Sequence, residues 1–279
     1  MPPPWAEIFG EDDSGIFAEF TLKQVRFAWR WIPSGRFLMG SPNTEPGRWP
    51  AEGPQHEVLL SGGFWMGETS VTQGQWRALM QENPSGFPGD QRPVENVTWH
   101  DAVTYSDALN DVVPALFAVL PTEAQWEYAC RAGTDSAFSD GSPCTQPEGD
   151  EPALEDLGWY DVNSRGETHP VRQKRPNSWG LYDLHGNVWE WCRDGWYNYG
   201  TQSKMDPVYE PKNESANRVI RGGSWIDQAR DCRSAYRNLR EPGYRYINLG
   251  FRLAAGLVFR VAELPDVERP MVPEKRSRD

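Results

Sequence analysis

Glycine and proline interrupt this chain so often that few stretches are long enough for an extended helix. The 279 residues include 26 glycines and 24 prolines, which end helices and begin turns. The chain also contains 14 tryptophans, large side chains that are usually buried between packed elements. This composition argues against a helical bundle and favours a compact fold of short strands with many turns.

The net charge of the chain is -12 at pH 7, which would repel a polyanion, so we expect no nucleic-acid partner. Residues 1–5 lack the basic and apolar parts of a secretion signal. No stretch approaches the roughly 20 apolar residues of a membrane span. These features predict a cytoplasmic protein that does not bind a membrane.

The four cysteines show no paired metal-binding spacing and are too few for a disulfide framework. They are Cys130, Cys144, Cys192 and Cys232. We expect reduced thiols, most of them buried.

Alternation of apolar and polar residues predicts several strands. Residues 27–31 alternate in this way, and Pro33, Ser34 and Gly35 predict a turn into a second strand at 36–39, so we expect a hairpin there. Further strands are expected at 56–60, 218–221 and 249–254.

Three segments begin with a threonine followed three residues later by glutamine or aspartate, the pattern of a helix N-terminus. The pairs are Thr72 with Gln75, Thr98 with Asp101, and Thr122 with Gln125. Apolar spacing predicts two main helices, at 98–110 and 122–132, and a shorter one after Thr72. Residues 133–177 are polar and rich in turn formers, which predicts ordered loops or one mobile insertion.

Four motifs occur in a fixed order along most of the chain. They are GRFLMGS at 35–41, LPTEAQWEY at 120–128, GNVWEW at 186–191, and RGGSW at 221–225 closed by GFR at 250–252. Together they resemble the formylglycine-generating enzyme, or sulfatase-modifying factor, family. The resemblance implies an α+β fold of the C-type-lectin type, with small mixed sheets, two main helices and a majority of ordered loop.

This resemblance also suggests how the chain is divided. Residues 1–25 would form an N-terminal strand or extension, and residues 26–255 the lectin-like domain. Residues 256–279 are rich in proline and charge without periodicity, so we expect a disordered tail.

The resemblance implies that catalysis would depend on two metal-binding positions. Oxidases of this family bind copper(I) through two cysteines, and the matching positions here are Asp227 and Cys232. A carboxylate is a hard ligand, poorly suited to copper(I). We therefore expect no copper and no enzyme activity, unless another thiol such as Cys192 takes part. In an oxidase the catalytic residues would be Cys232, Ser224 and Trp189; otherwise Ser224 is a turn residue and Trp189 a core residue.

Residues 218–252 further resemble the variable region of proteins diversified by diversity-generating retroelements. In such proteins fixed residues alternate with positions rewritten by adenine-directed mutagenesis. The candidate ligand-binding positions are Ile226, Asp227, Gln228, Asp231, Tyr236, Asn238, Leu239, Tyr244, Tyr246, Ile247 and Asn248. This mixture resembles antibody loops, in which tyrosine supplies contact area and Asp and Asn supply hydrogen bonds. Alternatively, these are ordinary surface residues of an inactive family member.

The fixed arginines of this region, Arg233, Arg237, Arg245 and Arg252, are expected to hold loops by bonding to carbonyls and carboxylates. His100 and His185 are expected to be hydrogen-bonded structural residues.

The family also binds calcium through a segment matching residues 183–190. The implied ligands are the Asp183 side chain, the Gly186 and Val188 carbonyls, and the Glu190 carboxylate, an oxygen set that suits calcium. The same carboxylates could instead stabilise a cap or a turn.

The function that these observations favour is non-enzymatic: a variable protein of a diversity-generating retroelement, with a hypervariable surface that binds a macromolecular partner, most simply a protein. The alternatives are a formylglycine-generating copper oxidase acting on a sulfatase cysteine, or an inactive regulatory module of that family.

Overall fold

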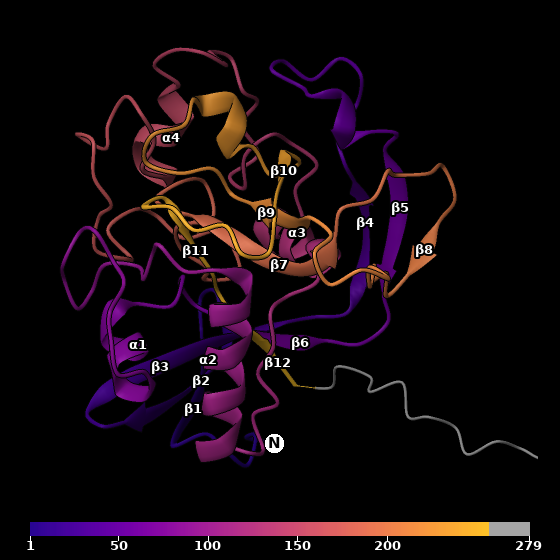
Figure 1. The fold of residues 1–279 in the computed structure, drawn as a ribbon. Coiled ribbons are helices and arrows are strands. Elements are labelled where there is room, and N and C mark those ends of the chain that lie inside the picture. The colour runs from indigo at the N-terminus through magenta and orange to yellow at the C-terminus, as the bar shows by residue number, and fades with distance from the viewer. Residues whose placement is uncertain (257–279) are drawn as a thin grey trace, which may run out of the picture.

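The computed structural model describes residues 1–256, so the predicted tail lies outside the described residues except for Gly256. Three small sheets and four helices are joined by long loops (Figure 1). The expected α+β lectin-like architecture with mainly loop structure is confirmed.

The largest sheet contains five strands in the order β1-β2-β3-β6-β12, all antiparallel. Its strands are β1 (Ile8–Asp12), β2 (Gly15–Leu22), β3 (Val25–Ile32), β6 (Phe64–Gly67) and β12 (Ala254–Ala255). The N-terminal strand β1 therefore forms one edge of the sheet, where it pairs with β2, and β2 in turn pairs with β3. The last described strand completes the opposite edge of the sheet.

A second sheet of four strands has the order β10-β9-β7-β11, and only β11 runs parallel to its neighbour. Its strands are β7 (Trp189–Gly195), β9 (Arg218–Arg221), β10 (Arg237–Arg240) and β11 (Leu249–Gly250). The strand expected at 249–254 is thus divided: β11 belongs to this sheet and β12 to the first.

The third sheet, β4-β5-β8, corrects the predicted hairpin. It consists of β4 (Gly35–Met39), β5 (His56–Leu60) and β8 (Lys204–Met205). The strand at 27–31 does not pair with β4, because β4 pairs instead with β5 across the loop that follows it. Figure 1 shows this sheet on the opposite side of the molecule from α1.

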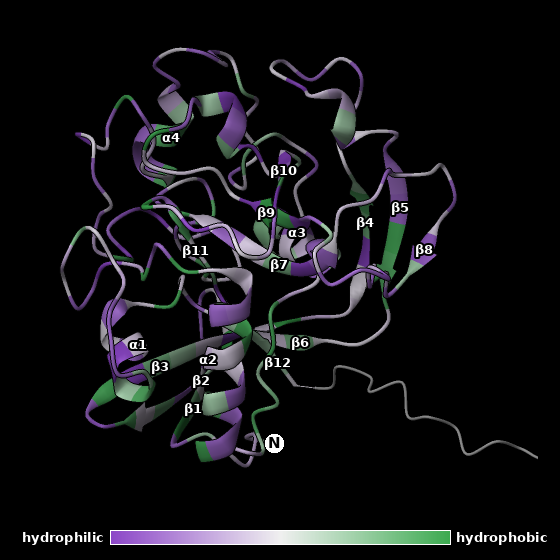
Figure 2. Cartoon of the chain, in the orientation of Figure 1, coloured by the Kyte–Doolittle hydropathy of each residue, from purple (hydrophilic) through white to green (hydrophobic). Residues whose placement is uncertain are grey.

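The three predicted helix starts are confirmed. The helices are α1 (Gln73–Leu79), α2 (Trp99–Val112) and α3 (Glu123–Arg131), and each begins after its threonine with a complete capping box. In Figure 2 the ribbon of α2 alternates between hydrophilic and hydrophobic residues, as an amphipathic helix does. A fourth helix, α4 (Pro152–Leu157), lies in the segment expected to be mainly loop.

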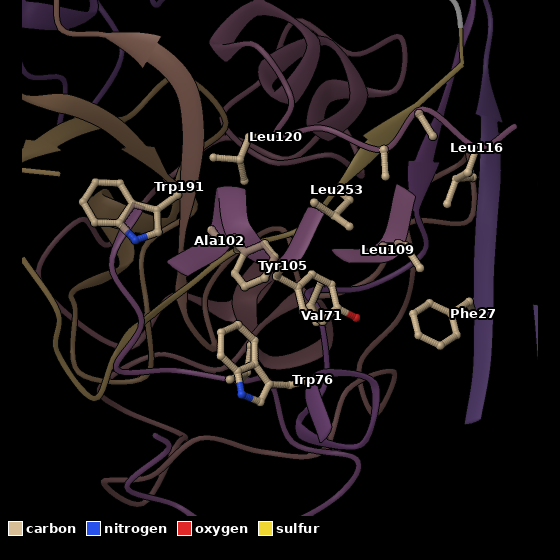
Figure 3. Close-up of a cluster of buried hydrophobic side chains, with 14 of the residues drawn as sticks. Phe27, Val71, Trp76, Ala102, Tyr105, Leu109, Leu116, Leu120, Trp191 and Leu253 are labelled. Carbon is tan, nitrogen blue, oxygen red and sulfur yellow. The ribbon is translucent and has the colours of Figure 1, made fainter. Parts of the chain in front are cut away.

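The main hydrophobic core fills the space between the five-stranded sheet and α1 and α2. Figure 3 shows Trp76 of α1 against Tyr105 of α2, with ring centroids 5.4 Å apart and nearly parallel planes. A second cluster lies beneath α3 and the third sheet. All four cysteines are buried and free, as predicted.

Candidate functional site

Residues 218–252 supply three strands of the second sheet and the loops that join them (Figure 1). The segment contains β9, a 3₁₀ turn at Ala229–Cys232, β10 and β11. Between β9 and the turn, Gly222 and Gly223 have φ angles of +100° and +70°, which favour glycine. A side chain at Gly223 would collide with the Cys232 sulfur, 2.6 Å from the Cβ position. The two glycines therefore allow the tight path that starts the segment.

Burial in this segment differs between the fixed residues and the candidate ligand-binding positions that alternate with them. The fixed residues Gly222, Gly223, Ser224 and Trp225 are buried, and so are the four residues at 232–235. None of the eleven candidate ligand-binding positions is buried: Ile226, Tyr244 and Tyr246 are exposed, and Asp227, Gln228, Asp231, Tyr236, Asn238, Leu239, Ile247 and Asn248 are half-buried. Three candidate positions are thus exposed and the other eight are partly accessible, whereas the fixed residues at 222–225 and 232–235 are enclosed.

The loop from Pro242 to Ile247 is attached to the rest of the protein through its backbone carbonyls. The Trp99 N–H at the start of α2 donates to the Pro242 carbonyl at 3.0 Å, and the Asn96 N–H donates to the Tyr246 carbonyl at 2.9 Å. The Trp225 indole N–H donates to the Ile247 carbonyl at 3.1 Å. Because the loop contributes backbone atoms, these bonds do not depend on which side chains it carries.

Buried arginines connect the segment to residues far away in the sequence, in a 3₁₀ turn at 50–52 and at the start of α3. Arg233 forms two hydrogen bonds to Glu52, at 2.6 and 2.9 Å, and both side chains are inaccessible to solvent. Arg237 donates twice to Glu123, each time at 2.7 Å. These contacts support the predicted structural role of the arginines. Their acidic partners were not predicted from the sequence.

Arg245 differs from the other three arginines. Its side chain is exposed, and it forms no ion pair with any described residue. The expectation that it holds a loop was wrong, because the loop around it is attached by backbone atoms.

Two of the candidate positions, Asp227 and Asn248, belong to a small polar cluster with Trp189 and Ser224. Asp227 Oδ2 accepts hydrogen bonds from the Trp189 indole N–H, at 2.8 Å, and from the Ser224 hydroxyl. Asn248 donates to Ser224 Oγ at 2.9 Å. Burial raises the pKa of Asp227 to about 6. The four side chains thus satisfy one another, and Trp189 and Ser224 have packing partners and hydrogen bonds that explain their positions.

A match to a known domain family shows which family the chain belongs to. Residues 24–257 match the sulfatase-modifying factor enzyme 1-like domain. The chain belongs to the sulfatase-modifying factor family. Formylglycine-generating enzyme from Mus musculus is 32% identical over 72% of this chain and 53% of its own length. The enzyme from Thermomonospora curvata is 32% identical over 82% of this chain and 73% of its own length.

Among solved structures, the chain is similar to Treponema denticola variable protein 1. The TM-score is 0.74 with 31% identity, covering 86% of this chain and 98% of that protein. The chain spans about half the length of the mammalian formylglycine-generating enzymes. In the described residues, no helix has the length and apolar character to cross a bilayer.

The residues at the copper position of family oxidases do not fit copper(I). Asp227 contributes only hard oxygen atoms. Cys232 is completely buried, and burial raises the pKa of its thiol well above the usual range, which disfavours the thiolate that binds metal. Cys192 belongs to a different hydrophobic cluster from Cys232. Within residues 1–256, no three His, Cys, Asp or Glu side chains are grouped so that they could hold a metal ion.

The calcium position of the family fits a cation only in part. Asp183 is buried, and its Oδ1 atom has no hydrogen-bond partner among the described residues. Burial raises the pKa of Asp183 to about 6. Glu190, in contrast, already accepts four hydrogen bonds, from Ser70, Trp126 and twice from Arg252. A cation here would therefore depend mainly on Asp183 and on the carbonyls of Gly186 and Val188.

The two histidines have different surroundings. His185 is buried, and its ring nitrogens lie 2.8 Å from the Cys232 carbonyl and 2.9 Å from Ser139 Oγ. Burial lowers the pKa of His185 to about 4, so the ring is neutral. This agrees with a structural role. His100 is exposed and packs edge-on to Trp99, and its ring forms no hydrogen bond with a described residue, so the expectation of a hydrogen-bonded residue was wrong for His100.

Proposed function

We propose that this protein is a non-enzymatic binding protein, the variable protein of a diversity-generating retroelement, and that residues 218–252 bind a protein partner. The observation that carries the proposal is that the fixed residues at 222–225 and 232–235 are buried while none of the eleven candidate positions is. The likeness to Treponema denticola variable protein 1 supports it. The backbone attachment of the loop supports it further, since such bonds tolerate changes of side chain.

The genomic surroundings of the gene test this proposal directly. We expect a near-copy of the DNA encoding residues 218–252 close to the gene, together with a reverse-transcriptase gene. The two copies should differ mainly where the template has adenines, and the differences should fall on the eleven candidate positions. If the genome contains neither a copy nor a reverse transcriptase, the proposal is wrong.

Tyr244 and Tyr246 are expected to act as binding anchors that do not support the fold. They are 39% and 46% exposed, and their rings lie 6.4 Å apart. Replacing both with alanine should weaken partner binding by at least about 30-fold, since buried aromatic anchors contribute about 2 kcal/mol or more. Calorimetry should show the melting temperature within about 2 °C of the wild type.

Tyr236 provides the contrast. Its ring packs against the main core and lies 5.9 Å from the Trp189 ring. The Tyr236→Ala variant should therefore melt at a clearly lower temperature. An equally large loss of stability in the Tyr244 and Tyr246 variant would contradict the anchor role.

The second candidate is a formylglycine-generating oxidase, favoured by the names of several relatives and by the presence of Cys232. An oxidase should bind copper(I) and convert the cysteine of a sulfatase-type peptide, and both properties should disappear in Cys232→Ala. An inactive regulatory module of the family would show neither property and no retroelement near its gene.

We also propose that Asp183 binds a structural calcium ion with the carbonyls of Gly186 and Val188. The support is the buried carboxylate oxygen that lacks a partner among the described residues. The other oxygen, Oδ2, accepts from the Arg172 N–H at 2.9 Å. Burial nevertheless disfavours the ionised carboxylate, and a bound cation would reduce this cost.

The effect of pH gives a test of this calcium site. Without calcium, the free energy of unfolding should fall as pH rises from about 4 to about 6. The reason is that the Asp183 carboxyl binds its proton more tightly in the folded state, with a pKa of about 6, than in the unfolded state, with a pKa of 3.8. At pH 7.5, calcium at about 100 times its Kd should raise the melting temperature by about 5 °C or more. Asp183→Asn should melt above the wild type in chelated buffer at pH 7.5, and the two should converge at pH 4.

Magnesium serves as the control for the calcium effect, since it requires a smaller octahedral site. Equal shifts with both ions, or no shift with calcium, would argue against a specific site at Asp183.

A further inference from the structure

A buried carboxyl group lies against the loop at 83–89, which follows α1. Glu95 is completely inaccessible to solvent. Its Oε1 atom accepts a hydrogen bond from the Phe87 N–H at 2.9 Å. Most other buried glutamates of the described chain face an arginine; they are Glu52, Glu68, Glu123, Glu127 and Glu190. Glu95 differs from them, because its side chain has backbone N–H groups as its donors.

The segments around Glu95 carry no other charge. Gly86 contacts both Glu95 and Ile247: a Cβ atom at Gly86 would lie 3.8 Å from Glu95 Oε1 and 2.9 Å from Ile247 Cγ2. Apart from Glu95, segments 83–89 and 93–98 contain no charged residue, and at 246–249 Tyr246 alone is titratable. Charged or titratable residues border these segments; they are Glu82, Asp90, Arg92, His100, Asp101 and Arg245. None of these described residues bonds to Glu95.

An ionised carboxylate in such surroundings has no counter-charge, and water does not reach it in the folded protein. Burial raises the pKa of Glu95 to about 7, although the backbone N–H groups of Phe87 and Gly86 lower it. The proton of Glu95 therefore dissociates near neutral pH.

The residue after Glu95 connects two loops. The Asn96 side chain donates to the Pro84 carbonyl at 3.0 Å, within the loop at 83–89. The Asn96 N–H donates to the Tyr246 carbonyl at 2.9 Å, within the loop at 242–247. Because one residue bonds to both loops, a movement of the first would disturb the attachment of the second.

We propose that Glu95 is a proton-operated switch that controls how firmly the loops at 83–89 and 242–247 are attached. With its proton, the carboxyl group is neutral and stays enclosed. When the proton leaves, the carboxylate requires hydration, and the loop at 83–89, whose Gly86 and Pro88 are exposed, opens to admit water. The bonds of Asn96 pass this opening on to Tyr246.

This inference rests on the proposed function only for what the loop at 242–247 binds. The loop is attached most firmly in acid and less firmly at neutral pH, so the pH would regulate its binding to a protein partner. The switch itself is tested without a partner or a genome sequence. Its failure and the failure of the proposed function are therefore separate results.

Amide hydrogen exchange between pH 5 and pH 8 tests the switch. Protection factors, which correct for the pH dependence of intrinsic exchange, should fall for the Phe87 and Asn96 amides by about tenfold for each pH unit up to about pH 7. The enclosed carboxyl binds its proton more tightly than the opened one, whose pKa is the ordinary 4.5, so rising pH favours the open state. The Trp99 amide, which bonds to the Pro242 carbonyl, should keep its protection factor, because the opening is local.

Glu95→Gln removes the titration but keeps an acceptor for the Phe87 N–H. In this variant the protection factors of Phe87 and Asn96 should not change with pH. Glu151→Gln is the matched control, since Glu151 is also buried but both of its oxygens accept backbone N–H groups. It should retain the pH dependence of the wild type.

Protection of Phe87 that is independent of pH in the wild type, or that changes equally in Glu95→Gln, would overturn the proposal. A response at Phe87 without one at Asn96, or an equal response at Trp99, would overturn it as well. Carbon-13 resonance of the Glu95 carboxyl group gives a measurement on the wild type that does not depend on any variant. A titration midpoint near 7 would support the switch, and one near 4.5 would contradict it.

Discussion

The Arg252→Ala variant is expected to lose about 3–5 kcal/mol of unfolding free energy, because it leaves a buried carboxylate without its counter-charge. Arg252 donates to both oxygens of Glu190, at 2.7 and 2.9 Å, and to the Tyr182 carbonyl at 2.8 Å. Both side chains of the ion pair are essentially inaccessible to solvent. The melting temperature should fall by about 6–20 °C in calorimetry.

Arg245→Ala is the matched control for this experiment. The side chain lies in the same segment but is exposed, so its removal should change the melting temperature by less than about 2 °C. If the two variants melted together, the arginines would not have the different structural roles that their burial indicates.

The Asp227→Cys variant is expected to gain a copper(I) site. It would restore the pair of cysteines that family oxidases use, with Cys232 as the second thiol. Because two thiolates suit copper(I) and a carboxylate does not, affinity should increase by several orders of magnitude. Competition with a chromogenic copper(I) chelator measures the gain.

Asp227→Ser is the control, since it also breaks the hydrogen bonds of Asp227 to Trp189 and Ser224 but adds no thiol. Tight binding of copper(I) by the wild type, or by Asp227→Ser, would show that Asp227 does not decide the metal chemistry of this site.

Local features of the fold could be predicted from the sequence, and long-range pairing could not. Thr72, Thr98 and Thr122 cap their helices through residues three positions away, so the signal lies within a few residues. The hairpin at 27–39 was wrong because alternation identifies a strand without identifying its neighbour. Phe37 pairs with Val58, and nothing in either strand specifies that choice.

Residues 218–252 show the same difference between local signals, which could be predicted, and long-range contacts, which could not. The interleaved pattern at 218–252 separated buried motif residues at 222–225 and 232–235 from positions that are exposed or half-buried, because the two sets have different chemistry. The acidic partners Glu52 and Glu123 were missed, since they lie more than one hundred residues from the arginines they bind. Arg245 and His100 were expected to form hydrogen bonds, but both are exposed and neither side chain bonds to a described residue, because residue type alone does not determine partners.

The backbone attachment of the loop at 242–247 has a consequence for protein engineering. Its contacts from Asn96 and Trp99 reach carbonyl oxygens, which every amino acid possesses. A combinatorial library randomised at Tyr244, Tyr246 and Ile247 should therefore retain a high proportion of folded members. Selection at these positions could then act mainly on recognition, although the Tyr244 and Tyr246 rings, 6.4 Å apart, are close enough for their substitutions to be coupled.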